Sequence, residues 1–323
     1  METKHELKAF NNVDDIEFKP KFIERYSKLT DWDTFETYCL SFLRRSIRVN
    51  TLKISIEDLK KRLEDLDWIL DPVPWCKEGF FIEHKTGRRD AGNTVEHQLG
   101  YFYIQEAASM IPPLVLDAKP HEHILDMASS PGSKTTQIAQ MMDNTGIIIA
   151  NDPSPKRMAP LCANLTRLGI INTVTTVMKG QQFNKYKQKF DRVLLDAPCS
   201  GTGTIRKSVK TIRMWNPKVL KSICAVQNEL IKAAWNCLKP GGVLVYSTCS
   251  LEPEENEGLI SSFLNEHPEA KVEGFSLPGL KKGDAVLEFE GQVYNKEVEK
   301  TCRLWPQDND TEGFFIAKIK KEK

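Results

Sequence analysis

The sequence ILDMASSPGSK, residues 124–134, joins a short apolar strand to the first turn of a helix. Small residues in such a turn let a ligand approach the backbone closely, and the first turn of the helix offers free N–H groups. The turn has neither the glycine spacing of a Walker A loop nor the pattern G-x-G-x-x-G. The sequence therefore predicts a ligand-binding loop formed by Ala128, Ser129, Ser130, Pro131, Gly132, Ser133 and Lys134.

An acidic residue follows the next predicted strand, residues 147–149. Asp152 lies twenty positions after Gly132, where a carboxylate in an open α/β sheet can bind the hydroxyl groups of a ribose. An alternative is that Asp152 only stabilises a helix N-terminus, because Asp152-Pro153-Ser154-Pro155 is also a favourable helix start. We expect the loop and Asp152 together to hold a nucleoside cofactor.

Short apolar strands and amphipathic helices alternate after this loop. Further strands are predicted at residues 174–178, 193–195, 243–246 and 313–317, and one helix face consists of Met158, Leu161, Cys162, Leu165 and Leu168. A long helix begins after Asn216-Pro217 and ends at Lys239-Pro240-Gly241-Gly242. This alternation predicts an α/β fold with a parallel, doubly wound sheet over residues 101–323.

The first hundred residues show a different pattern. Strands are predicted at residues 47–52, 68–70 and 80–82, and a helix is predicted from the spacing of Ile56, Leu59, Leu63 and Leu66. No phosphate-binding loop occurs here. We therefore expect a small α+β module over residues 1–100, with the domain boundary at about residue 100.

The composition indicates a globular protein rather than a membrane or secreted one. The 323 residues are 40% hydrophobic and 28% charged, and no apolar run approaches the roughly 20 residues of a membrane-spanning helix. The first ten residues are charged rather than apolar, so no signal peptide is visible. Eight cysteines occur without the C-x-x-C spacing of zinc or redox sites. We expect a cytoplasmic protein with reduced cysteines and no bound metal.

Two cysteines follow two consecutive strands of the predicted sheet. Cys199 lies in Asp196-Ala197-Pro198-Cys199-Ser200-Gly201-Thr202-Gly203, and Cys249 lies in Thr248-Cys249-Ser250. Both thiols are expected over one cleft, although either cysteine alone would more often be a buried core residue. A thiolate that adds to carbon 6 of cytosine enables carbon 5 to attack a methyl sulfonium, and Asp196 could assist at the ring nitrogen.

Basic residues cluster after the first of these cysteines. Residues 197–228 contain no acidic residue but include Arg206, Lys207 and Lys210, whereas the net charge of the whole chain is only +1. Such a stretch is typical of a surface that faces phosphate groups, and Arg48 in the N-terminal module is a further candidate. The alternative is a solvated helix face whose counter-charges come from elsewhere in the fold.

These motifs resemble the Sun (Fmu-like, nucleolar-protein) family of RNA cytosine-5 methyltransferases. The similarity spans nearly the whole chain, from residues 45–51 to residues 313–317, and its most specific part is the pairing of the two cysteine motifs. Residues 103–110 resemble the helix that leads into the family's catalytic domain. The resemblance implies a Rossmann-like methyltransferase domain that uses S-adenosyl-L-methionine, preceded by an RNA-binding module.

The resemblance also implies roles for individual residues. Cys249 matches the family's nucleophile, and Cys199 matches the cysteine that assists release of the product. Lys134 and Asp196 match residues that contact the target base, and both are expected to border the cofactor as well.

Two further positions concern the cofactor. Asp152 matches the family's ribose-binding acid, and Arg157 matches a basic residue at the cofactor. Lys179 is a departure, because the family often has an aspartate there beside the adenine, and a lysine cannot accept the adenine amino proton.

The identity of the substrate leaves several alternatives. A compact chain without long basic extensions favours transfer RNA, and ribosomal RNA is the alternative within the same chemistry. Methylation of DNA would assign the attack to Cys199 and leave Cys249 without a role. A catalytically silent RNA-binding scaffold is expected to lack the nucleophile or the cofactor loop, and this sequence has both. No protein partner is predicted.

Overall fold

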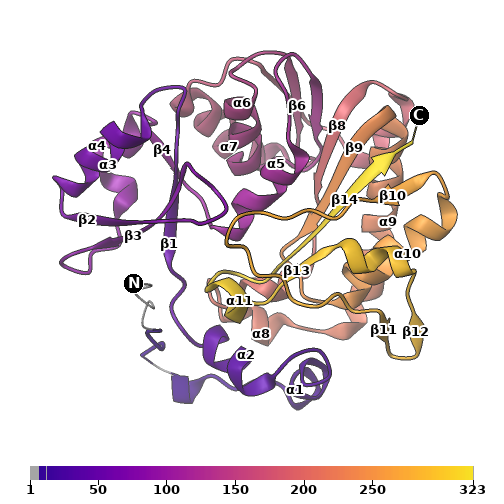
Figure 1. The fold of residues 1–323 in the computed structure, drawn as a ribbon. Helices are drawn as coiled ribbons and strands as arrows, with labels where there is room; N and C mark the ends of the chain where they lie inside the picture. Colours follow the sequence, from indigo (N-terminus) through magenta and orange to yellow (C-terminus); the bar gives the residue numbers. More distant parts are fainter. Residues whose placement is uncertain (1–6, 12, 323) are drawn as a thin grey trace.

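The computed structural model describes residues 7–11 and 13–322 and is built around a large mixed sheet (Figure 1). Its strands are β5 (His123–Asp126), β6 (Ile147–Asn151), β7 (Thr173–Thr176), β8 (Phe190–Asp196), β9 (Leu238–Thr248), β10 (Ala270–Val272), β13 (Cys302–Leu304) and β14 (Phe314–Lys321). The strand order is β10-β14-β9-β8-β5-β6-β7, and β13 pairs with β14. Strands β5 to β9 pair in parallel, whereas β14 runs antiparallel to β9.

Helices cover both faces of this sheet. On one face lie α5 (Ile111–Leu116), α6 (Ser133–Met141) and α7 (Pro155–Leu168), and on the other lie α9 (Leu220–Cys237) and α10 (Glu257–Glu266). Alternate residues of one strand reach opposite cores, since Leu194 packs on the side of α5 while Val193 and Leu195 pack on the side of α9. Burial of both faces explains the continuous apolar run in β8. The predicted α/β architecture is confirmed.

The N-terminal module contains a second, antiparallel sheet. Its strand order is β2 (Trp68–Pro72), β3 (Gly79–His84), β1 (Arg45–Val49) and β4 (Phe102–Ile104), and α3 (Ile56–Glu64) packs on it through Leu59 and Leu63. Helix α4 (Val95–Gln98) precedes β4. Strand β4 lies past the expected boundary at residue 100 but pairs with β1. Residues 103–110 are therefore not one helix, since β4 is followed by a 3₁₀ turn over Ala108–Met110.

The first two helices do not pack on the N-terminal sheet. Side chains of α1 (Pro20–Tyr26) and α2 (Trp32–Cys39) form a buried aromatic cluster with Trp215 and Trp305 from the α/β part of the chain. Figure 1 shows both helices below β13 and beside the short helices α8 (Lys210–Met214) and α11 (Pro306–Asn309). A small hairpin, β11 (Glu288–Phe289) and β12 (Gln292–Val293), lies nearby.

Two features are absent from residues 7–11 and 13–322. No helix in these ranges is long and apolar enough to cross a membrane. No group of three or more His, Cys, Asp or Glu side chains there is arranged to hold a metal ion.

Candidate active site

The two cysteines meet at one edge of the main sheet. Cys199 follows β8 and Cys249 follows β9, and the strands pair in parallel with Asp196 opposite Ser247. The two sulfur atoms lie 3.3 Å apart, both residues are free thiols, and both are partly exposed. The hydrogen bond to Cys249 and burial together raise the pKa of Cys199 well above its ordinary value. Cys199 therefore loses its proton less readily than an ordinary cysteine.

A buried carboxylate holds the two cysteine turns together. Oε2 of Glu255 accepts hydrogen bonds from the backbone N–H of Ser200 at 3.0 Å and from Nε2 of Gln227 at 2.8 Å. Its Oε1 accepts from the hydroxyls of Ser200 and Ser250. Glu255 is fully buried, and no specific sequence signal identifies it, because Glu252 and Glu254 beside it suggest a solvated acidic segment. The feature of the sequence that points to Glu255 is its position just after the turn that contains Cys249.

A charged pair lies beside the thiols. Nζ of Lys134 lies 2.8 Å from Oδ2 of Asp196, and the hydroxyl of Ser247 donates to the other carboxylate oxygen at 2.8 Å. Burial alone would lower the pKa of Lys134, but the charge of Asp196 outweighs burial and raises it. The ammonium also lies 5.4 Å from the centre of the Phe314 ring. Sequence analysis placed Lys134 and Asp196 at this edge, and the structure brings them together with the cysteines.

The predicted cofactor loop follows β5 as expected and contains a tight turn at Gly132. This glycine has φ of 101°, a conformation that side chains with a Cβ rarely adopt. Asn151 joins the ends of three strands, because its amide donates to the carbonyls of Met127 and Met178 and accepts from the hydroxyl of Thr176. Ser129 donates its hydroxyl to the carbonyl of Asn151 at 3.0 Å.

Two buried carboxylates flank the loop and each has an oxygen without a partner. Oδ1 of Asp126 and Oδ2 of Asp152 accept no hydrogen bond within the described part of the chain. The second oxygens are engaged, by the hydroxyl of Thr135 at 2.6 Å and the N–H of Ser154 at 2.9 Å. Burial raises the pKa of Asp126 to about 7. Two free carboxylate oxygens fit a ligand that carries ribose hydroxyls and an ammonium group, as S-adenosylmethionine does. Asp126 is predicted from sequence only as part of a strand and not as a cofactor-binding residue.

Arg157 stabilises the loop itself. Its guanidinium donates to the carbonyl of Ser130 at 2.6 Å, and the hydroxyl of Ser130 donates back to the carbonyl of Arg157 at 2.7 Å. The guanidinium also lies 3.3 Å from Oδ2 of Asp152, without the geometry of a hydrogen bond. Lys179 lies just beyond β7 with an exposed side chain.

Two of the four arginines and lysines predicted to contact RNA are in the interior. Arg48 is 1% exposed, and its guanidinium donates to Gln105 and to Thr136 and Gln140 of α6. Arg206 is 3% exposed and pairs with Asp310 at 2.7 Å. A guanidinium with this burial and these partners cannot also reach a phosphate, so both predictions are wrong. Both side chains join distant segments instead.

The other two predicted RNA contacts, Lys207 and Lys210, have exposed side chains. Their role is not tested by this arrangement and stays a prediction.

Comparison with known proteins identifies the family. The model for the 16S rRNA methyltransferase RsmB/F matches residues 113–320, and the model for the N-terminal domain of 16S rRNA methyltransferase RsmF matches residues 18–107. The chain belongs to the RsmB/F methyltransferase family. The resemblance to the Sun family is thereby confirmed, as is the assignment of the chain as an RNA cytosine-5 methyltransferase.

Individual RsmB/F relatives differ in how much of their length this chain covers. The chain is 50% identical over 322 residues to the tRNA (cytosine(49)-C(5))-methyltransferase of Pyrococcus abyssi, which covers 99% of both proteins. It is 45% identical over 293 residues to the ribosomal RNA small subunit methyltransferase F of Aliivibrio salmonicida. That match covers 90% of this chain but only 60% of the relative.

Solved structures support the same fold. A methyltransferase homolog protein from Pyrococcus horikoshii has a TM-score of 0.80 at 36% identity, covering 94% of this chain and 99% of that chain. NSun6 from the same organism, solved with SFG, has a TM-score of 0.83 at 26% identity, covering 95% and 99%. The Rossmann-like methyltransferase fold is therefore confirmed. SFG is an analogue of S-adenosylmethionine, which agrees with use of this methyl donor by the family.

Proposed function

We propose that this chain transfers a methyl group from S-adenosylmethionine to carbon 5 of a cytosine in transfer RNA. The observation that carries the proposal is the pair of thiols 3.3 Å apart at adjacent strand ends, beside Lys134 and Asp196. Transfer RNA is favoured because the relative named for it is 50% identical over 99% of this chain, whereas the ribosomal RNA relative from Aliivibrio salmonicida is 45% identical over 90% of it. We expect the reaction in the cytoplasm, where both thiols stay reduced.

The cofactor has a defined place in this proposal. Asp152 would accept a ribose hydroxyl at its free Oδ2, and Asp126 would accept the ammonium of the methionine part at its free Oδ1. The loop from Ala128 to Lys134 would border the cofactor, held in shape by Arg157. When bound, S-adenosylmethionine supplies the electrophilic methyl group.

The chain's own residues would then activate the cytosine. The thiolate of Cys249 adds to carbon 6, which forms a carbon–sulfur bond and makes carbon 5 nucleophilic. Lys134 and Asp196, held together with Ser247, would border the ring nitrogen side of the base, where the ammonium of Lys134 offsets the negative charge that this addition places on the ring. Cys249 is proposed as the attacking sulfur because its Thr-Cys-Ser turn matches the family's nucleophile and its sulfur lies at the strand end beside Lys134 and Asp196.

Elimination completes the cycle. Once carbon 5 carries the methyl group, a base such as a water molecule would take the proton from that carbon. The electron pair of the broken C–H bond would re-form the double bond between carbons 5 and 6, and the sulfur of Cys249 would depart as a thiolate. Cys199 lies next to the bond that breaks and would assist this step. The N-terminal module would orient the RNA so that one cytosine can turn out of its stack into the site.

The two cysteines provide the test. Purified Cys249→Ala and Cys199→Ala proteins would be incubated with unmodified tRNA transcripts and S-adenosylmethionine carrying a labelled methyl group. Cys249→Ala should lose both methylation and any covalent adduct. Cys199→Ala should form a covalent protein–RNA species that is retained as a slow band on a denaturing gel. Cys162→Ala is the matched control, because Cys162 is an exposed cysteine on α7.

Other outcomes would contradict specific parts of the proposal. An adduct with Cys249→Ala and none with Cys199→Ala would reverse the two roles. Transfer of label to a small-subunit rRNA transcript and not to tRNA would replace the substrate by the runner-up while keeping the chemistry. Bisulfite sequencing of the labelled RNA would identify the modified cytosine.

A further inference from the structure

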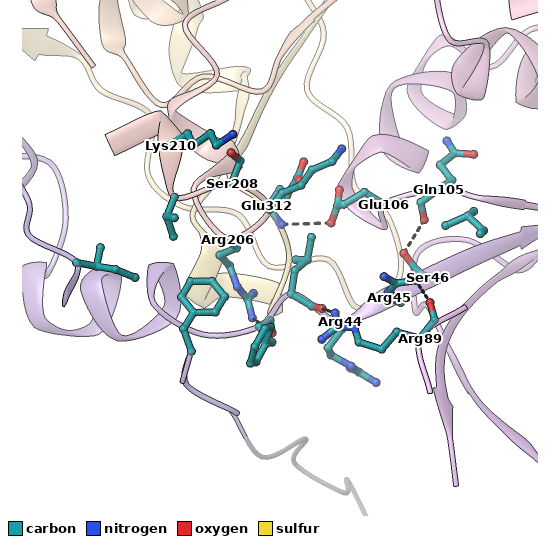
Figure 2. Close-up of a pocket in the computed structure, with 17 residues that line it drawn as sticks. Arg44, Arg45, Ser46, Arg89, Gln105, Glu106, Arg206, Ser208, Lys210 and Glu312 are labelled. Atoms are coloured by element: carbon teal, nitrogen blue, oxygen red, sulfur yellow. Dashed lines mark hydrogen bonds between the residues drawn. The ribbon is translucent and has the colours of Figure 1, made fainter. Parts of the chain in front are cut away.

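A cavity lies near the proposed active site, between the N-terminal module and the methyltransferase domain. Its volume is about 650 Å³, within the rough range of 300–1,000 Å³ for small-molecule sites. Figure 2 shows its walls, with Arg44, Arg45 and Arg89 on one side and Ser208 and Lys210 on the other. None of Lys134, Asp196, Cys199 and Cys249 lines it, so the cavity is separate from the thiol site.

The chemistry of the walls suits a nucleotide. Cations on the rim could contact phosphates, and Lys207 and Lys210 have exposed side chains that can do so. Apolar side chains, among them the half-buried Phe42 and the exposed Ile104, form a surface on which a base could stack.

Between the two walls lie two carboxyl groups with different roles (Figure 2). Both oxygens of Glu106 are used, since they accept the backbone N–H groups of Ser109 at 3.0 Å and of Glu312 at 3.2 Å. Glu312 is only 5% exposed, yet its Oε1 has no hydrogen-bond partner in the described part of the chain. A buried acceptor without a partner is costly unless a ligand satisfies it.

The two carboxyl groups have different electrostatic surroundings. Burial and the charge of Glu312 raise the pKa of Glu106 to about 8. Burial also raises the pKa of Glu312, but the charges of Lys207, Lys134 and Arg206 oppose this shift. Glu312 is therefore the carboxyl group that has cations around it and an oxygen without a hydrogen-bond partner in the described part of the chain.

Glu312 is directly connected to the thiol site. The next residue, Gly313, donates its N–H to the carbonyl of Gly203, and Gly203 donates its N–H to the carbonyl of Cys249. Phe314 lies under the ammonium of Lys134. A nucleotide held at Glu312 would therefore be a close neighbour of a cytosine held at Cys249.

We propose that this cavity binds a guanine nucleotide of the RNA immediately beside the target cytosine, with Glu312 reading the base. Guanine carries two adjacent N–H donors on its Watson–Crick edge, N1–H and the N2 amine, which a carboxylate accepts together. Adenine presents no such pair. The cations of the rim hold the phosphates without reading the sequence. This inference rests on the proposed function, because it takes the thiol site as the place of the cytosine.

The test compares short RNAs that differ in one base. Fluorescein-labelled uridine nonamers with a central cytosine would carry guanosine, inosine or adenosine on its 5′ or 3′ side, and affinity for the full chain would be measured by anisotropy at one salt concentration. Guanosine on one of the two sides should bind roughly tenfold more tightly than adenosine. Inosine, which lacks the N2 amine, should lie between them.

Variants assign the preference to its residue. Glu312→Gln should abolish the preference for guanosine over adenosine, whereas Glu57→Gln, at an exposed glutamate of α3, should keep the preference. If Glu312→Gln does not fold, the guanosine–inosine difference in the wild-type protein carries the test alone. Equal affinities for all three bases, or a preference that survives in a folded Glu312→Gln, would overturn the proposal.

Failure of this inference is distinguishable from failure of the proposed function. Methyl transfer to tRNA is measured in parallel with the same protein. Methyl transfer without a preference for guanosine would overturn only the proposal that Glu312 reads the base. A guanosine preference without transfer supports the cavity and overturns the methylation.

Discussion

Replacing Asp152 with asparagine is expected to weaken the binding of S-adenosylmethionine without unfolding the protein. Asp152 is completely buried directly after β6, and its two oxygens have separate functions. Oδ1 accepts the N–H of Ser154 at 2.9 Å before α7 begins, and an asparagine retains this acceptor. Oδ2 has no hydrogen-bond partner in the described chain and is the atom that the ribose would use.

The expected loss of affinity for S-adenosylmethionine follows from the single free oxygen, Oδ2 of Asp152. One hydrogen bond to a charged group contributes about 1.5–3 kcal/mol, which corresponds to an affinity loss of about 10- to 150-fold. A larger loss would require both oxygens of Asp152 to contact the cofactor, and Ser154 already occupies one of them.

Isothermal titration of the purified variant with S-adenosylmethionine measures the effect. Asp143→Asn is the matched control, because Asp143 is exposed just after α6 and its φ of 51° suits asparagine. The control should bind like the wild type, and both variants should melt within a few degrees of it. An Asp152→Asn protein that is folded and binds with wild-type affinity would refute the assignment of Asp152 to the cofactor.

Four further predictions concern charged groups in and around the site. Glu255→Gln replaces an acceptor of four hydrogen bonds and should lower the free energy of unfolding by about 3 kcal/mol in urea titrations; an unchanged midpoint would contradict this. Asp126 has a pKa of about 7 in the folded protein against an ordinary value of 3.8, so the folded state holds a proton that the unfolded state loses between these pH values. As the pH rises through this range, the wild type should lose about 1.4 kcal/mol of stability per pH unit relative to Asp126→Asn. Parallel curves of stability against pH for the two proteins would exclude the raised pKa. Alanine at both Lys207 and Lys210 should flatten the log–log salt dependence of single-stranded RNA affinity by roughly 0.7 per lost phosphate contact. Arg206→Ala should instead destabilise the fold by about 3–5 kcal/mol, because it leaves a buried ion pair without one partner; a stable Arg206→Ala protein with weakened RNA binding would reverse this distinction.

The active-site edge could be predicted from sequence because it depends on local order. A strand, a short turn and the next helix are neighbours in the chain, so the loop at residues 128–134 and the turns at Cys199 and Cys249 were placed correctly relative to their strands. Parallel strands then bring their carboxyl ends to one edge. The sequence order does not specify that β5 lies next to β8, which is the pairing that brings Lys134 to Asp196.

The two buried arginines could not be predicted in this way. Charge is visible in a sequence but burial is not, and the partners of Arg48 lie 57–92 positions away. Arg206 likewise reaches Asp310 and the carbonyl of Thr311, 105 positions away. Of the predicted RNA contacts in this basic cluster, Lys207 and Lys210 have exposed side chains, and their contact with RNA stays a prediction.

The placement of the first two helices changes how the chain is divided. Arg25 of α1 pairs with Glu252 at 2.8 Å and with Glu254, and the hydroxyl of Tyr26 donates to Glu252 at 2.9 Å. Glu252 also accepts from the indole N–H of Trp215 at 2.8 Å. These contacts fix the segment that follows the Cys249 turn.

The same acidic segment therefore serves two purposes, since Glu255 joins the cysteine turns while Glu252 and Glu254 anchor α1. Removing α1 would leave Glu252 buried without its counter-charge, three residues from the proposed nucleophile. Residues 20–39 thus act as a support of the catalytic site, although they precede the N-terminal sheet in sequence. We infer that the module free to orient RNA consists of the sheet β2-β3-β1-β4 with α3, and that the helices before it belong functionally to the methyltransferase domain.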